Sequence, residues 1–324
     1  MSLSRRSFLG ALVLAAPAVL TGRRAGGARA QADTGAPLVT NYNTTARPVI
    51  VEGRTLLIAL TFASEVEILS GSLPVPIQPE AAGGQQLIEP QELYFYPVRG
   101  RRIYRVILSA PLDSVMGSHA LRVRARSAAG RVQDWTFPYF IERGPYRSTS
   151  LTLDEDFSAP PPDVAARMRR DFQTDVEILK RVSPRRWTMP FVRPVAGRDN
   201  DNFGVRRTVN GTKRYRHIGL DFRASTGTPV QAINDGTVAL SMEQWTAGHT
   251  VIIDHGGSVF SKYNHLSERR VQAGQAVTRG QVIALSGRSG GQNSPPHLHL
   301  DTFVNRTAVD PEDFMRTAAQ LISV

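Results

Sequence analysis

Hydrophobic and polar residues alternate in short runs from about residue 37 to residue 150. Gly, Pro and Asn interrupt these runs at short intervals. The clearest run, HALRVRARS at residues 119–127, places three hydrophobic side chains on one face and three arginines on the other. Alternation with a period of two is typical of half-buried β-strands, so this part of the chain is predicted to be built from strands.

The period changes to that of a helix between residues 160 and 183. Prolines and Asp163 precede a segment whose hydrophobic residues are spaced three or four apart, which predicts one amphipathic helix of about 18 residues. Packing in a core is the ordinary role of such a stripe. It consists of Val164, Met168, Phe172, Val176 and Leu179. Three further prolines, at 184, 190 and 194, predict an extended linker after the helix.

Strand signals return from Phe203 onward. Short β-rich runs separated by Gly turns predict a compact antiparallel β-domain, and PEDFMRTAAQLI at 311–322 predicts a closing helix. The fold class is therefore mainly β. We expect an immunoglobulin-like N-terminal β-sandwich over 37–150, a connecting helix over 160–183 and the antiparallel domain over 184–324.

Residues 1–30 resemble an export signal. Arg5 and Arg6 precede a hydrophobic run at 8–20, and the small residues Ala28 and Ala30 follow, which is typical of a twin-arginine signal peptide. The run is shorter than the ~20 residues that span a bilayer, although an uncleaved anchor is the alternative. We therefore expect a periplasmic or secreted protein without stable membrane insertion after signal removal. The absence of cysteine means that no disulfide stabilises it.

The charge does not indicate a nucleic-acid partner. Loss of the five arginines among residues 1–30, which hold no acid, lowers the net charge from +11 to +6. No basic run is interleaved with aromatic residues as in nucleic-acid-binding segments. A modest positive charge suits an anionic cell-wall polymer, and the arginine face of 119–127 either contacts such a polymer or is simply solvated.

The seven histidines are distributed unevenly. In PPHLHLD, His297 and His299 share one face if the segment is a strand, while in HIGLDF a strand would direct His217 and Asp221 the same way, with Gly219 leaving space between them. Imidazole and carboxylate are standard zinc ligands, and a catalytic zinc takes three protein ligands. Either histidine of the H-x-H pair can supply the third, unless the pair is only a surface feature, and His265 in YNHLS is a further candidate.

From about residue 187 to residue 314 the chain resembles the lysostaphin-type (LytM-like) zinc metallopeptidases. The matching text includes FGVRR, HIGLDFRASTGTPVQAINDGTVALS, YNHLS and PPHLHLD. The resemblance implies a domain that binds one Zn²⁺ and cuts peptide bonds in bacterial peptidoglycan. It makes His217, Asp221 and His299 the zinc ligands and His265 and His297 the catalytic histidines. One departure is Leu300-Asp301, where the family has Phe-Glu.

The sequence thus predicts a secreted zinc endopeptidase whose partners are peptidoglycan peptides. The alternatives are a non-enzymatic regulator that binds and activates amidases, and a structural wall-binding protein. The remaining histidines, His119, His249 and His255, are expected to be solvated, the last two at turns. The sequence does not predict the bond cut, the oligomeric state, which catalytic histidine is the general base, or whether the N-terminal region positions or covers the enzyme.

Overall fold

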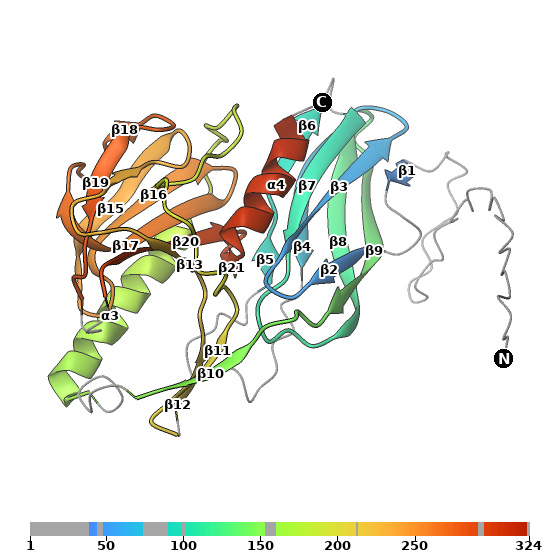
Figure 1. Ribbon diagram of the computed structural model, residues 1–324. Coiled ribbons are helices and arrows are strands. Elements are labelled where there is room, and N and C mark those ends of the chain that lie inside the picture. Colours follow the sequence, from blue (N-terminus) through green and yellow to red (C-terminus); the bar gives the residue numbers. More distant parts are fainter. Residues whose placement is uncertain are drawn as a thin grey trace, which may run out of the picture. The chain divides into compact units, whose positions relative to one another are not determined.

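The computed structural model describes residues 39–43, 48–73, 90–98, 102–152, 160–211, 213–290 and 295–322 (Figure 1). Residues 37–324 form one compact unit. The predicted signal peptide at 1–30 lies outside the described residues. None of the helices within the described ranges has the length and apolar character needed to cross a bilayer.

The N-terminal strands form two sheets around a shared hydrophobic core. One sheet has the order β1-β3-β7-β6 and the other the order β2-β9-β8-β4-β5. The alternation read from residues 119–127 is confirmed, because Leu121, Val123 and Ala125 are buried and the arginines between them are exposed. The immunoglobulin-like assignment stays a prediction. The strands are β1 (Val39–Asn43), β2 (Val49–Val51), β3 (Thr55–Phe62), β4 (Val66–Leu73), β5 (Gln91–Glu92), β6 (Phe95–Val98), β7 (Ile103–Ser109), β8 (Gly117–Ser127) and β9 (Val132–Glu142).

A separate three-stranded sheet lies, in sequence, between the N-terminal strands and the C-terminal strands. Strand β10 (Ser148–Leu151) pairs in parallel with β11 (Arg206–Val209), and β11 pairs in antiparallel with β12 (Lys213–Arg216). Helix α3 (Pro162–Leu179) lies between β10 and β11 in sequence. The parallel pair therefore brings residues on both sides of the helix together.

The C-terminal strands form a nine-stranded sheet whose pairings are antiparallel, as predicted. Its central order is β13-β20-β17-β16-β15-β18, with β14, β19 and β21 attached at the sides. The closing helix α4 (Pro311–Ile322) spans the predicted residues. The strands are β13 (Leu220–Arg223), β14 (Pro229–Gln231), β15 (Gly236–Gln244), β16 (Gly248–Gly256), β17 (Val259–Arg269), β18 (Ala276–Val277), β19 (Val282–Ser286), β20 (His297–Val304) and β21 (Thr307–Val309).

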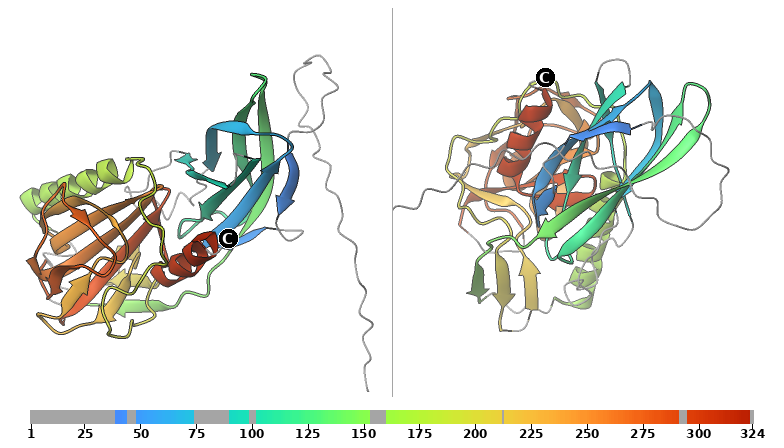
Figure 2. Two further views of the ribbon diagram at one scale, coloured as in Figure 1. Left: turned by 90° about the horizontal axis from the view of Figure 1, so that it is seen from above. Right: turned by 90° about the vertical axis from the view of Figure 1, so that its right-hand side faces the viewer.

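Helix α3 differs from its prediction in the face that it presents to the sheet. Figures 1 and 2 show the helix beside the strands β15 to β17. Only its last turn is fully buried, and Phe172 of the predicted stripe remains 37% exposed. The helix also directs two carboxylates at the sheet: Asp171 accepts a hydrogen bond from Trp245 N at 2.8 Å, and Asp175 accepts one from Gln244 Nε2 at 2.7 Å. Hydrogen bonds thus contribute to the packing of α3 against the sheet, which the sequence pattern predicted to be purely apolar.

The predicted extended linker is packed against the protein. Trp187, the largest fully buried side chain, and Phe191 belong to the same core cluster as the C-terminal strands. Tyr96 and Ile107 of the N-terminal sheets belong to that cluster too. The N-terminal and C-terminal sheets are therefore joined by a continuous hydrophobic core.

A buried ionic cluster adds to this junction. Glu52, which follows β2, is fully buried, and its carboxylate lies 3.5 Å from the guanidinium of Arg216 in β12. The same guanidinium contacts Asp113 at 2.5 Å.

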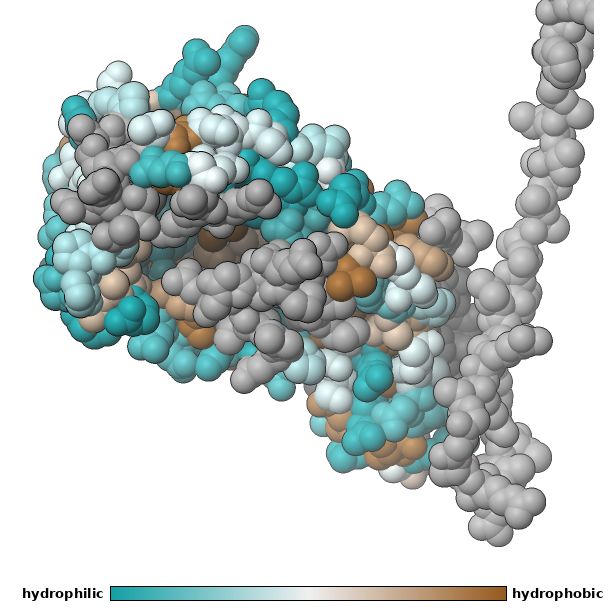
Figure 3. All heavy atoms as spheres, turned by 90° about the horizontal axis from the view of Figure 1, so that it is seen from below, coloured by the Kyte–Doolittle hydropathy of each residue, from teal (hydrophilic) through white to brown (hydrophobic). Residues whose placement is uncertain are grey.

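On the face of the molecule drawn in Figure 3, hydrophobic surface residues are scattered among hydrophilic ones.

Candidate metal centre

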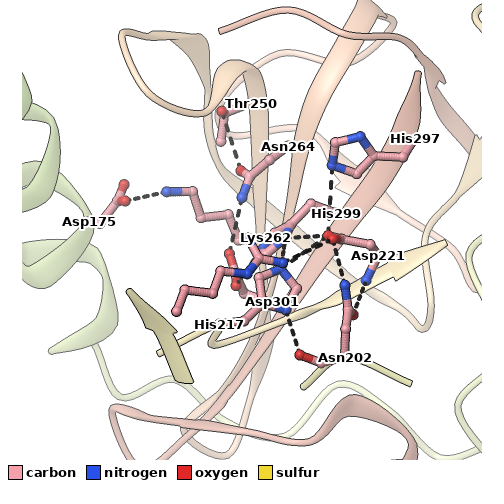
Figure 4. A network of polar contacts seen from close by, with 11 residues as sticks. Asp175, Asn202, His217, Asp221, Thr250, Lys262, Asn264, His297, His299 and Asp301 are labelled. Carbon is pink, nitrogen blue, oxygen red and sulfur yellow. Dashed lines mark hydrogen bonds and ion pairs between the residues drawn. The ribbon is translucent and has the colours of Figure 1, made fainter. Parts of the chain in front are cut away.

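Strand pairing brings the predicted ligands together. In the antiparallel register of β13 and β20, Asp221 is the direct partner of His299. His217 lies just before β13, which begins at Leu220, so the expected shared strand face does not include it. Its Nε2 nevertheless lies 3.1 Å from His299 Nδ1 and 3.2 Å from Asp221 Oδ1, and His299 Nδ1 lies 2.8 Å from the same oxygen. Three ligand atoms therefore converge, as Figure 4 shows.

The outer nitrogens of the two imidazoles are engaged elsewhere. His217 Nδ1 donates to the backbone carbonyl of Asn202 at 2.9 Å, and His299 Nε2 donates to Asp301 Oδ1 at 2.7 Å. A proton on each outer nitrogen leaves the inner nitrogen with its lone pair. The inner atoms of the cluster are then two imidazole lone pairs and one carboxylate oxygen.

This donor set fits zinc. Three acceptors facing one another without a donor between them repel, and a cation at their centre removes the repulsion. Two imidazole nitrogens and one carboxylate oxygen are also the ligands of many catalytic zinc ions. Without a cation, burial lowers the pKa of His299, but Asp301 and Asp221 outweigh burial and raise that pKa to about 10.

Asp221 is held as a carboxylate. Burial alone would raise its pKa, but the adjoining imidazoles of His217 and His299 lower it far below the usual range. Its other oxygen accepts a hydrogen bond from Asn202 Nδ2 at 2.7 Å and lies 3.6 Å from the guanidinium of Arg207. Asn202 therefore contacts both His217 and Asp221 and fixes their relative positions.

The two predicted catalytic histidines lie beside this cluster. His265 Nδ1 donates to the carbonyl of Ser289 at 2.9 Å, and His297 Nδ1 donates to that of Pro295 at 2.8 Å. In the neutral ring of each histidine, Nε2 is then an acceptor. The ring centroids of His265 and His297 are 4.8 Å apart, and His297 Nε2 lies 3.7 Å from Asp221 Oδ1. Burial, followed by the charges of His299 and His297, lowers the pKa of His265 to about 4.

Gly219 is required by close packing. A Cβ at this position would lie 2.6 Å from Asp301 Oδ1, from His299 Nε2 and from the carbonyl oxygen of Leu300. From the sequence, Gly219 was expected to leave space between His217 and Asp221. The His299–Asp301 hydrogen bond lies in that space. A larger residue would displace one partner of that bond.

Several residues of the site were not predicted. Asn202 and Arg207 lie in the segment NDNFGVRR, and Asp301 directly follows HLHL. Proximity to the histidine motifs was the one available signal.

The expectation for His255 was wrong: it lies in strand β16, is fully buried, and hydrogen-bonds Asp235 O at 2.7 Å and Ser261 Oγ at 2.8 Å. These polar partners allow a neutral histidine to remain in the core.

Residues 215–311 match the model of peptidase family M23. The chain therefore carries a peptidase family M23 domain, in agreement with the resemblance seen in its motifs. Over 114 residues it is 41% identical to the peptidoglycan DD-endopeptidase ShyA of Vibrio cholerae, a match that covers 35% of this chain and 26% of ShyA. Over 116 residues it is 38% identical to the glycyl-glycine endopeptidase ALE-1 of Staphylococcus capitis, covering 33% and 31%. The matches thus span about a quarter to a third of these relatives.

A solved structure is similar over a longer part of the chain. It is described as a putative peptidase M23 from Pseudomonas aeruginosa, and it superimposes with a TM-score of 0.60 at 23% sequence identity. The alignment covers 82% of this chain and 95% of that one. The shared fold therefore extends beyond the family domain.

Proposed function

We propose that the protein is a zinc-dependent endopeptidase that hydrolyses peptide bonds in bacterial cell-wall peptidoglycan. The observation that carries the proposal is the convergence of His217, Asp221 and His299, with the free Nε2 atoms of His265 and His297 beside them. Zinc held by the three ligands supplies Lewis-acid polarisation of the scissile carbonyl and of the attacking water.

His297 is the proposed general base. Its Nε2 carries a lone pair, and the Asp221 carboxylate at 3.7 Å stabilises the imidazolium that forms when this nitrogen accepts a proton from water. The same imidazolium can then donate the proton to the leaving amine. His265, also an acceptor at Nε2, orients the attacking water by accepting a hydrogen bond from its other O–H group.

The substrate class is proposed from the relatives together with the site. ShyA and ALE-1 are both named as endopeptidases, the first of peptidoglycan and the second of glycyl-glycine bonds. Because these names specify different bonds, the similarity supports the peptide part of the wall as the substrate but does not select one bond.

A non-enzymatic regulator is the alternative, and the complete set of three ligands and two partner histidines argues against it. Digestion of purified peptidoglycan by the mature protein separates the two. We expect soluble fragments whose masses show peptide-bond cleavage, no release with a chelator, and recovery on zinc addition. Intact sacculi in the zinc-loaded reaction, with release only when an amidase is added, would identify a regulator.

We further propose export to the periplasm or the cell exterior. The support is the twin-arginine pattern at residues 1–30. Cell fractionation of wild type and of the double variant Arg5→Lys, Arg6→Lys tests the proposal. Export of wild type and retention of the variant in the cytoplasm are expected, whereas equal export of both would contradict a twin-arginine route.

A further inference from the structure

One face of the central sheet carries both helix α3 and the metal centre. In the register of β17 and β20, three successive cross-strand pairs share this face. Phe260 and Phe303 pack with the last turn of α3 in one hydrophobic cluster. The next two pairs are polar: Lys262 lies opposite Asp301, and Asn264 lies opposite His299.

The two polar pairs form a buried network with the helix (Figure 4). Lys262 Nζ lies 2.5 Å from Asp175 Oδ2 of α3, and these side chains are only 11% and 16% exposed. Asp301, 3% exposed, accepts from His299 Nε2 at 2.7 Å and from Asn264 Nδ2 at 3.1 Å. An ion pair, Asp175–Lys262, therefore lies beside a second group, Asn264–Asp301–His299, and the two meet at the cross-strand neighbours Lys262 and Asp301.

The charges of this network depend on one another. A buried ammonium group needs a carboxylate nearby. Lys262 has two candidate carboxylates: Asp175 on the helix, with which it is paired, and Asp301, its neighbour on strand β20. While Asp175 neutralises Lys262, Asp301 is left to bind the Nε2–H of His299. Without Asp175, the ammonium group would compete with His299 for Asp301.

We propose that Asp175 and Lys262 are positioning residues for His299, so that helix α3 helps to set the affinity of the metal centre; this rests on the zinc site of the proposed function. The helix is then part of the site as well as a connection between two parts of the chain. Partners beyond the ligands commonly change metal affinity by about 10- to 100-fold when they are mutated.

Zinc affinity, measured by competition with a chromophoric chelator, tests the proposal without any assay of hydrolysis. Asp175→Asn keeps the shape of residue 175 and one of its two acceptor oxygens but removes its charge, and we expect about tenfold weaker zinc binding or more. The matched control is Glu177→Gln on the same helix, whose exposed partner is Lys180 at 2.8 Å. It should bind zinc within about twofold of wild type, because exposed pairs interact weakly.

The double variant Asp175→Asn, Lys262→Met separates charge from packing. With both charges removed, no ammonium group competes with His299 for the Asp301 carboxylate. Zinc affinity should therefore return to within about threefold of wild type. Unchanged affinity in Asp175→Asn, or a double variant as weak as the single one, would overturn the proposal.

A further variant keeps the test decisive if Asp175→Asn does not fold. Asp301→Asn retains an acceptor for His299 but not the charge, and it too should bind zinc at least about tenfold more weakly. Wild-type affinity in this variant would also overturn the proposal. Failure of wild type to bind zinc would instead contradict the proposed function itself.

Discussion

At the scale of single residues, the ligand assignment makes a direct prediction. His217→Ala or Asp221→Ala should abolish both zinc retention and hydrolysis, because two ligands alone rarely hold a catalytic zinc against a chelator. Metal analysis of the purified proteins is the measurement, and about one zinc per wild-type chain is expected. His119→Ala, whose ring contacts Val115 and Tyr139 in the N-terminal region, is the control and should keep its zinc. Full zinc content in both ligand variants would rule out the assignment.

The partner histidines should respond differently. His265→Ala and His297→Ala remove acceptors beside the ligands without removing a ligand, so zinc content and fold should persist. Hydrolysis should fall by roughly 10²–10⁴, the range typical of proton transfer and of electrostatic stabilisation in the transition state. Steady-state rates and metal content, measured on the same preparations, decide. Loss of zinc from His297→Ala with retention by His299→Ala would exchange the roles of these two residues.

The convergence of His217, Asp221 and His299 could be predicted because their residue types are scarce and their motifs are short. The groups that orient them could not. Asn202 contacts His217 and Asp221 through a backbone carbonyl and a side-chain amide, and neither contact imposes a recognisable spacing on the sequence. Asp301 was visible only as a departure from a family pattern, although it fixes the tautomer of His299. Such partners become evident only when strand register is known.

At the scale of elements, His255 links β16 to its neighbours and makes stability depend on pH. Burial lowers the pKa of His255 to about 4, below the unfolded value of 6.5. The neutral ring donates to Asp235 O and accepts from Ser261 Oγ, so protonation breaks the second bond. Because the folded pKa is the lower one, this contribution is fully present above pH 6.5 and is lost as the pH falls toward 4, by about 3 kcal/mol.

Comparison with His255→Gln isolates this effect. The variant should be less stable than wild type at pH 7.5, but its free energy of unfolding should fall by about 3 kcal/mol less between pH 6.5 and pH 4. Urea unfolding at a series of pH values measures both slopes. Metal release and the other titrating groups are common to the two proteins and cancel in the difference. Equal slopes would mean that His255 does not titrate as expected.

The helical and strand periods predicted most elements, since they report which side of an element is buried. They did not predict what α3 binds. The hydrophobic period places Asp171 and Asp175 on the solvent side of the helix, whereas in the structure both carboxylates point at the sheet. The partners of these residues are a backbone N–H in the turn after β15 and a glutamine and a lysine on strands, all more than 60 residues away in sequence. Long-range pairing of that kind leaves no local periodicity.

At the scale of the whole molecule, the N-terminal sheets are joined to the peptidase domain by buried charge as well as by the hydrophobic core. Glu52 accepts from Asp113 N at 2.9 Å and from Gly144 N at 3.2 Å, and it faces Arg216, the residue directly before His217. The boundary at 184 remains a prediction. The described contacts nevertheless lead us to expect one cooperative unfolding transition for both parts, because neither part can separate without exposing this cluster.

Glu52→Ala tests this coupling. The substitution leaves two backbone N–H groups and part of the Arg216 charge without their buried acceptor, which should lower the free energy of unfolding by about 3–5 kcal/mol. The matched control is Glu67→Ala on β4, whose pair with Arg126 is about half exposed, and it should cost no more than about 1 kcal/mol. Urea unfolding followed by fluorescence of Trp135 in the N-terminal sheets and of Trp187 in the peptidase core, each as the sole remaining tryptophan, measures both parts. Coincident transitions, shifted together by Glu52→Ala, are expected. If only the Trp135 transition moved, the N-terminal region would be an independent module.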